Sequence, residues 1–142
     1  MRPSSDGVVF FVDRALGSED VPNALKGAGA TVQIHADHFS AHEESDAPWI
    51  KDVTERGWVI LTKDKRIRWN ALEKRTLERA GAAAFILTAG DQSGIENDAA
   101  FVDALPRIRA VLSKYTRPLL CTVSANGSVR VLLGDRRGGI RR

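Results

Sequence analysis

The chain has 142 residues, of which 43% are hydrophobic and 27% charged, and its formal net charge is +3. This length and apolar content suit one domain with a substantial core, and every apolar run is much shorter than the roughly 20 residues that span a bilayer. The start of the chain has no signal-peptide pattern, and the single cysteine, Cys121, excludes an intrachain disulfide or a cysteine metal cluster. We therefore expect a cytoplasmic protein that does not enter a membrane.

The first third of the chain predicts a βαβ unit. Residues 8–13, VVFFVD, form a continuous apolar run that ends on Asp13, as a buried strand would. A helix is predicted from about Asp20 to the glycines at 27 and 29, and residues 31–34 form a second short strand. Parallel strands joined by a helix cross over with a right-handed connection.

The middle of the chain is organised around residues 57–68, GWVILTKDKRIR. A polar loop at 35–48 contains all three histidines and leads into a short helix at 49–56. Gly57 ends that helix, residues 58–61 form a buried strand, and Thr62, Lys63 and Asp64 follow where the strand ends. A helix over residues 70–80 comes next and is closed by Gly81.

The last third predicts a fourth buried strand at 82–88 and a helix at 97–113. Residues 119–123 and 129–133 form an edge hairpin around Asn126-Gly127. No repeat or linker divides the chain, so we expect one α/β domain with a mostly parallel sheet over residues 1–134. Residues 135–142 form a basic, disordered C-terminal tail.

Three carboxylates are placed where one site can gather them. Asp13 and Asp64 follow two strands whose carboxyl ends can border the same crevice, and Asp46 precedes the helix at 49–56. Clustered carboxylates repel one another unless a cation lies among them, and oxygen ligands favour Mg²⁺ or Mn²⁺. Each aspartate could instead serve as a turn residue or a helix cap. Glu43 or Glu44 could take the place of Asp46 as the third acid of the site.

The surrounding residues suit a polyanionic substrate. Lys63, Arg66 and Arg68 flank Asp64, and such bases contact a phosphate or stabilise a charged transition state. A solvated helix face is the alternative interpretation of this basic cluster. The three histidines fit no standard zinc spacing with cysteines.

Several segments together resemble the PIN-like domains of VapC-type toxins in bacterial toxin–antitoxin pairs. The resemblance spans residues 8–87 and rests on FFVDRALG at residues 10–17, on Ser45-Asp46 followed by Trp49, on GWVILTKDKRIR and on the downstream Glu73. It implies a three-layer fold, an endoribonuclease that uses Mg²⁺ or Mn²⁺, an RNA substrate and a cognate antitoxin protein.

The resemblance also assigns residue roles. Asp13, Asp46 and Asp64 match the acidic positions that hold metal and catalyse cleavage, and Lys63, Arg66 and Arg68 match the substrate-binding basic positions. The family pattern has a fourth acid, for which Asp91 is the comparable residue here. Many such proteins dimerise, and residues 129–133 are the one stretch of this sequence that suggests an interface.

Two other classes of function would require a different set of residues from a nuclease. A receiver-type phosphorylation switch would need a lysine after the fifth strand, where this chain has Ser124-Ala125-Asn126-Gly127. A non-catalytic RNA- or protein-binding module with the same fold would have lost the acidic residues, and here all three are present.

Overall fold

The computed structural model describes residues 8–13, 16, 20–34, 52–63, 71–88 and 94–136, with backbone alone for residues 71–74 and 94–98. Six strands and three helices are defined in these ranges. The strands are β1 (Val9–Val12), β2 (Thr31–Ile34), β3 (Val59–Thr62), β4 (Ala83–Leu87), β5 (Tyr115–Val123) and β6 (Val129–Arg136). The helices are α1 (Asp20–Gly27), α4 (Ala71–Ala80) and α5 (Gly94–Lys114), and residues 52–55 add a helical turn before β3.

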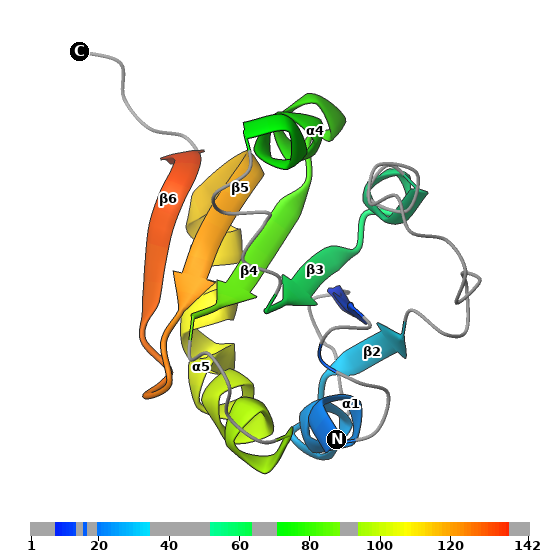
Figure 1. Ribbon diagram of the computed structural model, residues 1–142, viewed down its shortest axis with the longest axis vertical. Coiled ribbons are helices and arrows are strands. Elements are labelled where there is room, and N and C mark those ends of the chain that lie inside the picture. The colour runs from blue at the N-terminus through cyan, green and yellow to red at the C-terminus, as the bar shows by residue number, and fades with distance from the viewer. Residues whose placement is uncertain are drawn as a thin grey trace.

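One twisted sheet contains all six strands in the order β2-β1-β3-β4-β5-β6 (Figure 1). The first five strands are parallel, and β6 returns antiparallel to β5. Because β2 lies on one side of β1 and β3 on the other, the order in which strands are added to the sheet reverses after β2, and β1 and β3 are neighbours. Their carboxyl ends meet at the edge where ligands bind in open α/β sheets.

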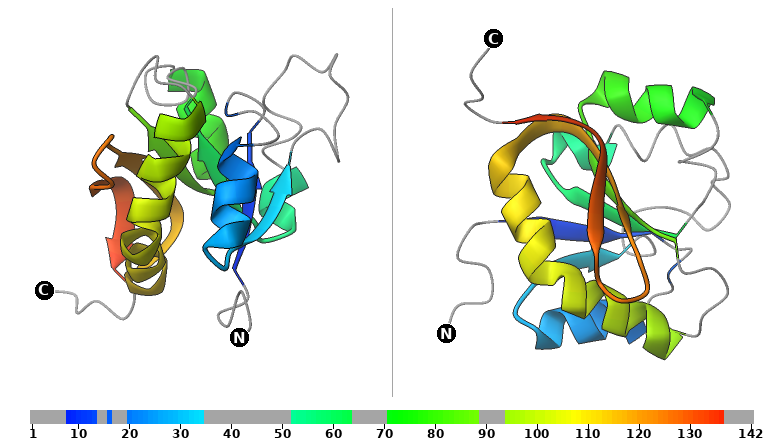
Figure 2. Two further views of the ribbon diagram at one scale, coloured as in Figure 1. Left: turned by 90° about the horizontal axis from the view of Figure 1, so that it is seen from below. Right: turned by 90° about the vertical axis from the view of Figure 1, so that its left-hand side faces the viewer.

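Helices cover both faces of the sheet, as the two views of Figure 2 show. On one face α1 and α5 pack on alternate strand residues such as Phe10, Phe85 and Cys121. On the other face Leu77 of α4 and Val53 of the helical turn pack on residues such as Ile60. Strands buried on both faces need a continuous apolar sequence, which explains why β3 and β4 have no polar alternation. The α/β three-layer architecture expected from the sequence is thus confirmed.

Element boundaries differ from the predictions mainly in the last third of the chain. Helix α5 begins at Gly94 and ends at Lys114, and β5 begins at Tyr115, four residues before its predicted start. Strand β6 continues to Arg136, so its last two residues belong to the segment predicted as tail. Tyr115 pairs with Arg136 and Thr116 with Asp135, and these pairs hold both strand ends in the sheet. The loop at 35–48 and residues 137–142 lie outside the described residues.

An arginine connects the amino ends of two strands that are not neighbours. Arg117 of β5 donates hydrogen bonds from Nη2 to the carbonyl of Gly57, at 3.1 Å, and from Nη1 to that of Trp58, at 3.4 Å. Both acceptors lie just before β3, and β4 runs between β3 and β5. In the described ranges, no helix is long and apolar enough to cross a membrane.

Candidate active site at the carboxyl ends of β1 and β3

Asp13 is the first residue after β1 and is fixed by the backbone of the neighbouring strand. Its N–H donates to the carbonyl of Leu61 in β3 at 2.9 Å, so the parallel pairing continues one residue past β1. Its own carbonyl accepts the N–H of Leu16 at 3.0 Å. The residue is only 6% exposed. Burial of an ionised carboxylate is unfavourable unless hydrogen bonds or a cation compensate.

Thr62, the last residue of β3, supplies one such hydrogen bond. Its hydroxyl donates to Oδ2 of Asp13 at 2.7 Å, and the threonine is fully buried. A bond of this length to a charged acceptor is strong and fixes the orientation of the carboxylate. From the sequence, Thr62 was predicted only as a residue at the end of the strand, and this role was missed. The available signal was a hydroxyl residue at the end of a strand that neighbours the strand of the acid.

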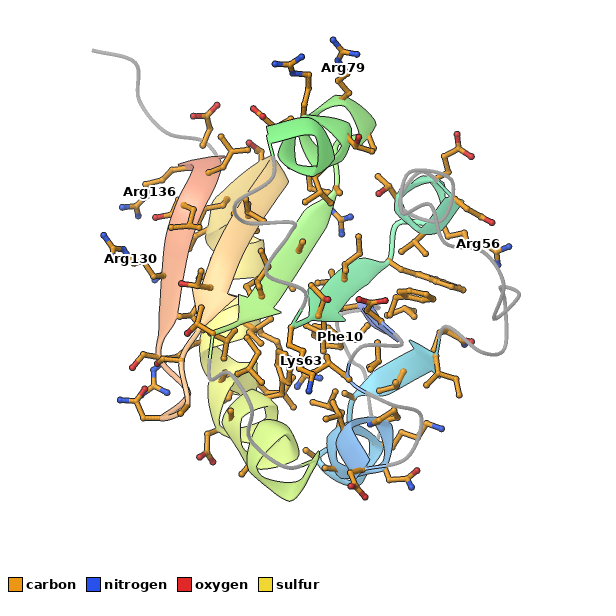
Figure 3. The ribbon with its side chains drawn as sticks, in the orientation of Figure 1. Phe10, Arg56, Lys63, Arg79, Arg130 and Arg136 are labelled. Carbon is orange, nitrogen blue, oxygen red and sulfur yellow. The ribbon has the colours of Figure 1, made fainter. Side chains whose placement is uncertain are left out.

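Lys63 follows β3 directly and brings a positive charge to the same end of the sheet. It is half-buried, and Figure 3 shows its side chain at the carboxyl end of β3. That a base next to Asp64 faces a substrate crevice stays a prediction. The described part of the site therefore combines a buried carboxylate, a hydroxyl that orients it and an ammonium group.

The other predicted site residues lie outside the described residues. These are Asp46, Asp64, Arg66 and Arg68, together with the alternatives Glu43, Glu44 and Asp91 and the three histidines. Their roles stay predictions. Asp64 is two residues after the end of β3 in the sequence.

The donor chemistry of the described residues fits a hard divalent cation. Asp13 offers carboxylate oxygens, which Mg²⁺ and Mn²⁺ prefer over nitrogen or sulfur ligands. Across the part of the chain that the structure describes, no three His, Cys, Asp or Glu side chains gather into a cluster. Two of the three predicted ligands lie outside that part, so a complete ligand set would require Asp46 and Asp64.

Cys121 is the one thiol of the chain, and its position excludes a catalytic role. The residue lies in the middle of β5, is fully buried and belongs to the core under α5. Burial raises the pKa of its thiol from 9.0 to about 12, because the thiolate would lose its hydration. The neutral thiol that results is neither a good nucleophile nor a good metal ligand.

Comparisons with known proteins converge on one family. The family model described as a PIN like domain matches residues 8–89, which is more than half of the chain. A Mycobacterium tuberculosis (strain H37Rv) protein named "Putative ribonuclease VapC45" is 36% identical over 126 residues, covering 87% of this chain and 91% of the relative. No solved structure matches the chain. Asp13, Thr62 and Lys63 all lie within the range that the family model matches.

Proposed function

The chain belongs to the family of PIN-like domains, and from that premise we propose that it is a metal-dependent endoribonuclease, the toxin of a type II toxin–antitoxin pair. Its reaction is the hydrolysis of phosphodiester bonds in RNA. The observation that supports this function most directly is the Asp13 carboxylate, buried at the carboxyl end of β1 and oriented by Thr62. Burying a carboxylate lowers the stability of a fold, and such residues are found most often at functional sites. In a metal-binding site the cation compensates the buried negative charge.

Asp13, Asp46 and Asp64 form the acidic centre in this proposal. Asp13 follows β1, and in the sequence Asp64 comes two residues after the neighbouring strand β3, while Asp46 precedes the helical turn at 52–55. A bound Mg²⁺ or Mn²⁺ would lower the pKa of a water molecule and stabilise negative charge on the scissile phosphate. The hydroxyl of Thr62 donates a hydrogen bond to Oδ2 of Asp13, and this bond fixes the orientation of the carboxylate.

Basic residues next to this centre bind the RNA backbone. Lys63 lies at the carboxyl end of β3, and Arg66 and Arg68 follow it closely in the sequence. Lysine contacts phosphate oxygens as a point charge, and arginine does so through a planar fork. Binding through these groups should therefore weaken steeply as the salt concentration rises.

The biological setting follows from the same family. The name of the mycobacterial relative describes a VapC ribonuclease, and a toxin of this type requires a cognate antitoxin protein that blocks its site. An RNA substrate and an antitoxin made in the same cell support a cytoplasmic location in this proposal. Contact with a membrane has no part in this function.

Cleavage of labelled total RNA by the purified, antitoxin-free protein tests the proposal. We expect cleavage with Mg²⁺ or Mn²⁺, none with EDTA, and loss of cleavage in Asp64→Asn. Asp103→Asn is the matched control, because it makes the same chemical change on an exposed position of α5. Its activity should equal that of the wild type.

Two results would contradict the proposal. A folded wild-type protein that binds several RNAs without cleaving any of them would be a binding module instead. Cleavage that persists in EDTA, or in Asp64→Asn at the wild-type rate, would remove the metal site from the reaction.

A further inference from the structure

A cavity of about 340 Å³ lies at the amino end of the sheet. Val8, which directly precedes β1, and Tyr115, the first residue of β5, both line it. In Figure 1 this is the end opposite the arrowheads of β4 and β5. The four residues of β1, about 13 Å of extended chain, separate this end from Asp13. The cavity is therefore distinct from the candidate active site.

One wall of the cavity is a single face of α5. Arg109, Leu112 and Ser113 line the cavity and are three and four residues apart, so their side chains lie along the same side of the helix. Arg109 and Leu112 are half-buried, whereas Ser113 is exposed. Solvent therefore reaches the cavity beside Ser113, near the carboxyl end of α5.

Arg117 of β5 supplies a second guanidinium, which the backbone already holds in place. Its Nη2 and Nη1 donate to the carbonyls of Gly57 and Trp58, at 3.1 and 3.4 Å. These acceptors are neutral, so the two bonds orient the guanidinium without cancelling its charge. A guanidinium has five N–H groups and can bind an oxyanion while it keeps such bonds. A donor that is already oriented loses little freedom when a ligand binds.

Positive charge predominates around the cavity. Arg109 and Arg117 line it, and no carboxylate is among its lining residues in the described part of the chain. On β6, Arg136 pairs with Tyr115, and Asp135 pairs with the next residue of β5. Paired residues of an antiparallel ladder share a face, so Arg136 lies on the face that carries the cavity and Asp135 on the other. An anion in this cavity would therefore meet a net positive charge.

The remaining lining residues suit an organic group. Val8, Leu112 and Leu119 contribute aliphatic surface, and Tyr115 contributes an aromatic ring. The volume of about 340 Å³ is near the lower limit for small-molecule sites, so the cavity fits one molecule of nucleotide size and not a polymer.

The two guanidinium groups distinguish between classes of anion. A phosphate monoester carries a charge of about −1.5 to −2 at pH 7 and has three acceptor oxygens. A carboxylate carries one charge and has two oxygens, which a single guanidinium can satisfy. Two guanidinium groups on one cavity therefore match the phosphate monoester better.

We propose that this cavity binds a phosphate monoester of a small organic molecule, with Arg109 and Arg117 on the phosphate and Tyr115 against the organic part. The dipole of α5 opposes an anion near the carboxyl end of the helix, but this effect is weaker than charge-assisted bonds to two guanidinium groups. The inference does not depend on the proposed nuclease function, because the cavity and Asp13 lie at opposite ends of the sheet.

Isothermal titration calorimetry of the full chain with adenosine 5′-monophosphate tests this site. EDTA in the buffer removes divalent cations, so the acidic centre cannot hold the phosphate through a metal. Adenosine and inorganic phosphate should each bind at least about tenfold more weakly than the nucleotide, because each lacks one of the two groups that the cavity recognises.

The exposed Ser113 allows a substitution that leaves the core intact. Ser113→Asp places a carboxylate at the cavity and should weaken nucleotide binding about tenfold or more through like-charge repulsion. Ser113→Asn has the same shape without the charge and is the matched control, which should bind like the wild type.

Removal of one guanidinium gives a second, independent measurement. Arg109→Gln should weaken nucleotide binding about tenfold or more, because a charge-assisted contact to the phosphate is lost. Arg79→Gln makes the same chemical change on the exposed surface of α4 and should have no effect. Lys63→Gln removes the ammonium group at the carboxyl end of β3 and should likewise leave nucleotide binding unchanged.

The proposal is overturned if the nucleotide does not bind the wild type, or if inorganic phosphate binds as tightly as the nucleotide. Equal binding by Ser113→Asp and Ser113→Asn also overturns it. Loss of binding in Lys63→Gln would place the nucleotide at the candidate active site and overturn it as well. Circular dichroism shows whether each variant is folded, and the Ser113 pair decides the matter if Arg109→Gln is not.

Discussion

Charged side chains are buried at the carboxyl end of β1 but exposed on the outer strand β6. Asp13 is 6% exposed, and its orientation depends on a hydrogen bond from one buried hydroxyl. Arg130, Asp135 and Arg136 on β6 are exposed to solvent. Burial of the Asp13 carboxylate costs folding free energy but gives the group a defined geometry. The exposed charges of β6 contribute little to stability and can contact other molecules.

Replacing the buried charge should separate activity from stability. Asp13→Asn keeps the shape of the side chain and an acceptor for Thr62, but it removes the negative charge that a cation requires. We expect RNA cleavage to fall by about a thousandfold or more, because a metal ligand is lost. The free energy of unfolding should stay the same or rise, since a neutral amide is easier to bury than a carboxylate. Initial cleavage rates and urea denaturation measure the two effects.

A clear drop in the urea midpoint of Asp13→Asn, with cleavage retained, would reverse this interpretation and make Asp13 a structural residue. Asp103→Asn on α5 is again the control, and it should change neither quantity.

The hydroxyl that orients Asp13 should matter next most. Thr62→Val preserves the volume of the buried side chain but cannot donate to Oδ2. We expect cleavage to fall about 10- to 100-fold, and stability to fall by about 1–3 kcal/mol, because Oδ2 of the buried carboxylate loses the hydrogen bond from Thr62. Thr62→Ser keeps the donor and should restore most of the cleavage rate. Equal activity in the valine and serine variants would show that the hydroxyl has no role in positioning.

The turn that precedes β6 depends on the backbone more than on charge. Gly127 has a φ of +85°, and a Cβ added there would lie 2.8 Å from Cβ of Asp103. Gly57 has a similar φ of +79°, with nothing within 4 Å of the added Cβ. Gly57→Ala should therefore cost about 1 kcal/mol, for backbone strain alone, and Gly127→Ala about 1–3 kcal/mol more, for overpacking.

Urea denaturation of the two alanine variants side by side gives this difference directly. Equal losses of stability would mean that α5 moves away easily from the turn. In that case the position of β6 would be set by its pairing with β5 instead of by the turn.

Cys121 adds a buried group that stays neutral. Its thiol should react with a thiol reagent at pH 8 far more slowly in the folded protein than in urea, because the pKa of about 12 leaves almost no thiolate. The raised pKa favours the folded state below about pH 9, and that contribution is lost as the pH rises from about 9 to about 12. Cys121→Ala should slightly reduce the dependence of the unfolding free energy on pH between about 9 and about 12. Rapid labelling of the native protein by the thiol reagent would contradict the burial of Cys121.

The parts of the fold that the sequence predicted are those with a local signal. The run ending at Asp13 is apolar because both faces of β1 are covered, and an apolar run between turn residues is visible without a structure. Asp13 was predicted as a site residue for the same reason, since it ends such a run. The structure shows that it is buried beside β3, and its role in a site stays a prediction.

Contacts between distant residues could not be predicted in this way. The hydrogen bond from Thr62 to Asp13 joins residues 49 positions apart and depends on the register between β1 and β3. Leu132, an additional residue on β6 at a shift in its register with β5, likewise becomes visible only when the two strands are paired, because two adjacent leucines in a strand do not by themselves identify a bulge. The hydrogen bond orients the proposed catalytic carboxylate, and the additional residue changes which face the later residues of β6 occupy.

The two hydrogen bonds from Arg117 to the segment before β3 link the local unfolding of β5 to that of β3. Because one guanidinium holds the carbonyls of Gly57 and Trp58, β5 cannot separate from the sheet without releasing the entry to β3. Local unfolding of the two regions should then be a single cooperative event, with amides in both exchanging hydrogen at similar rates. The half of the sheet with the proposed active site and the half with β6 would therefore share one opening free energy.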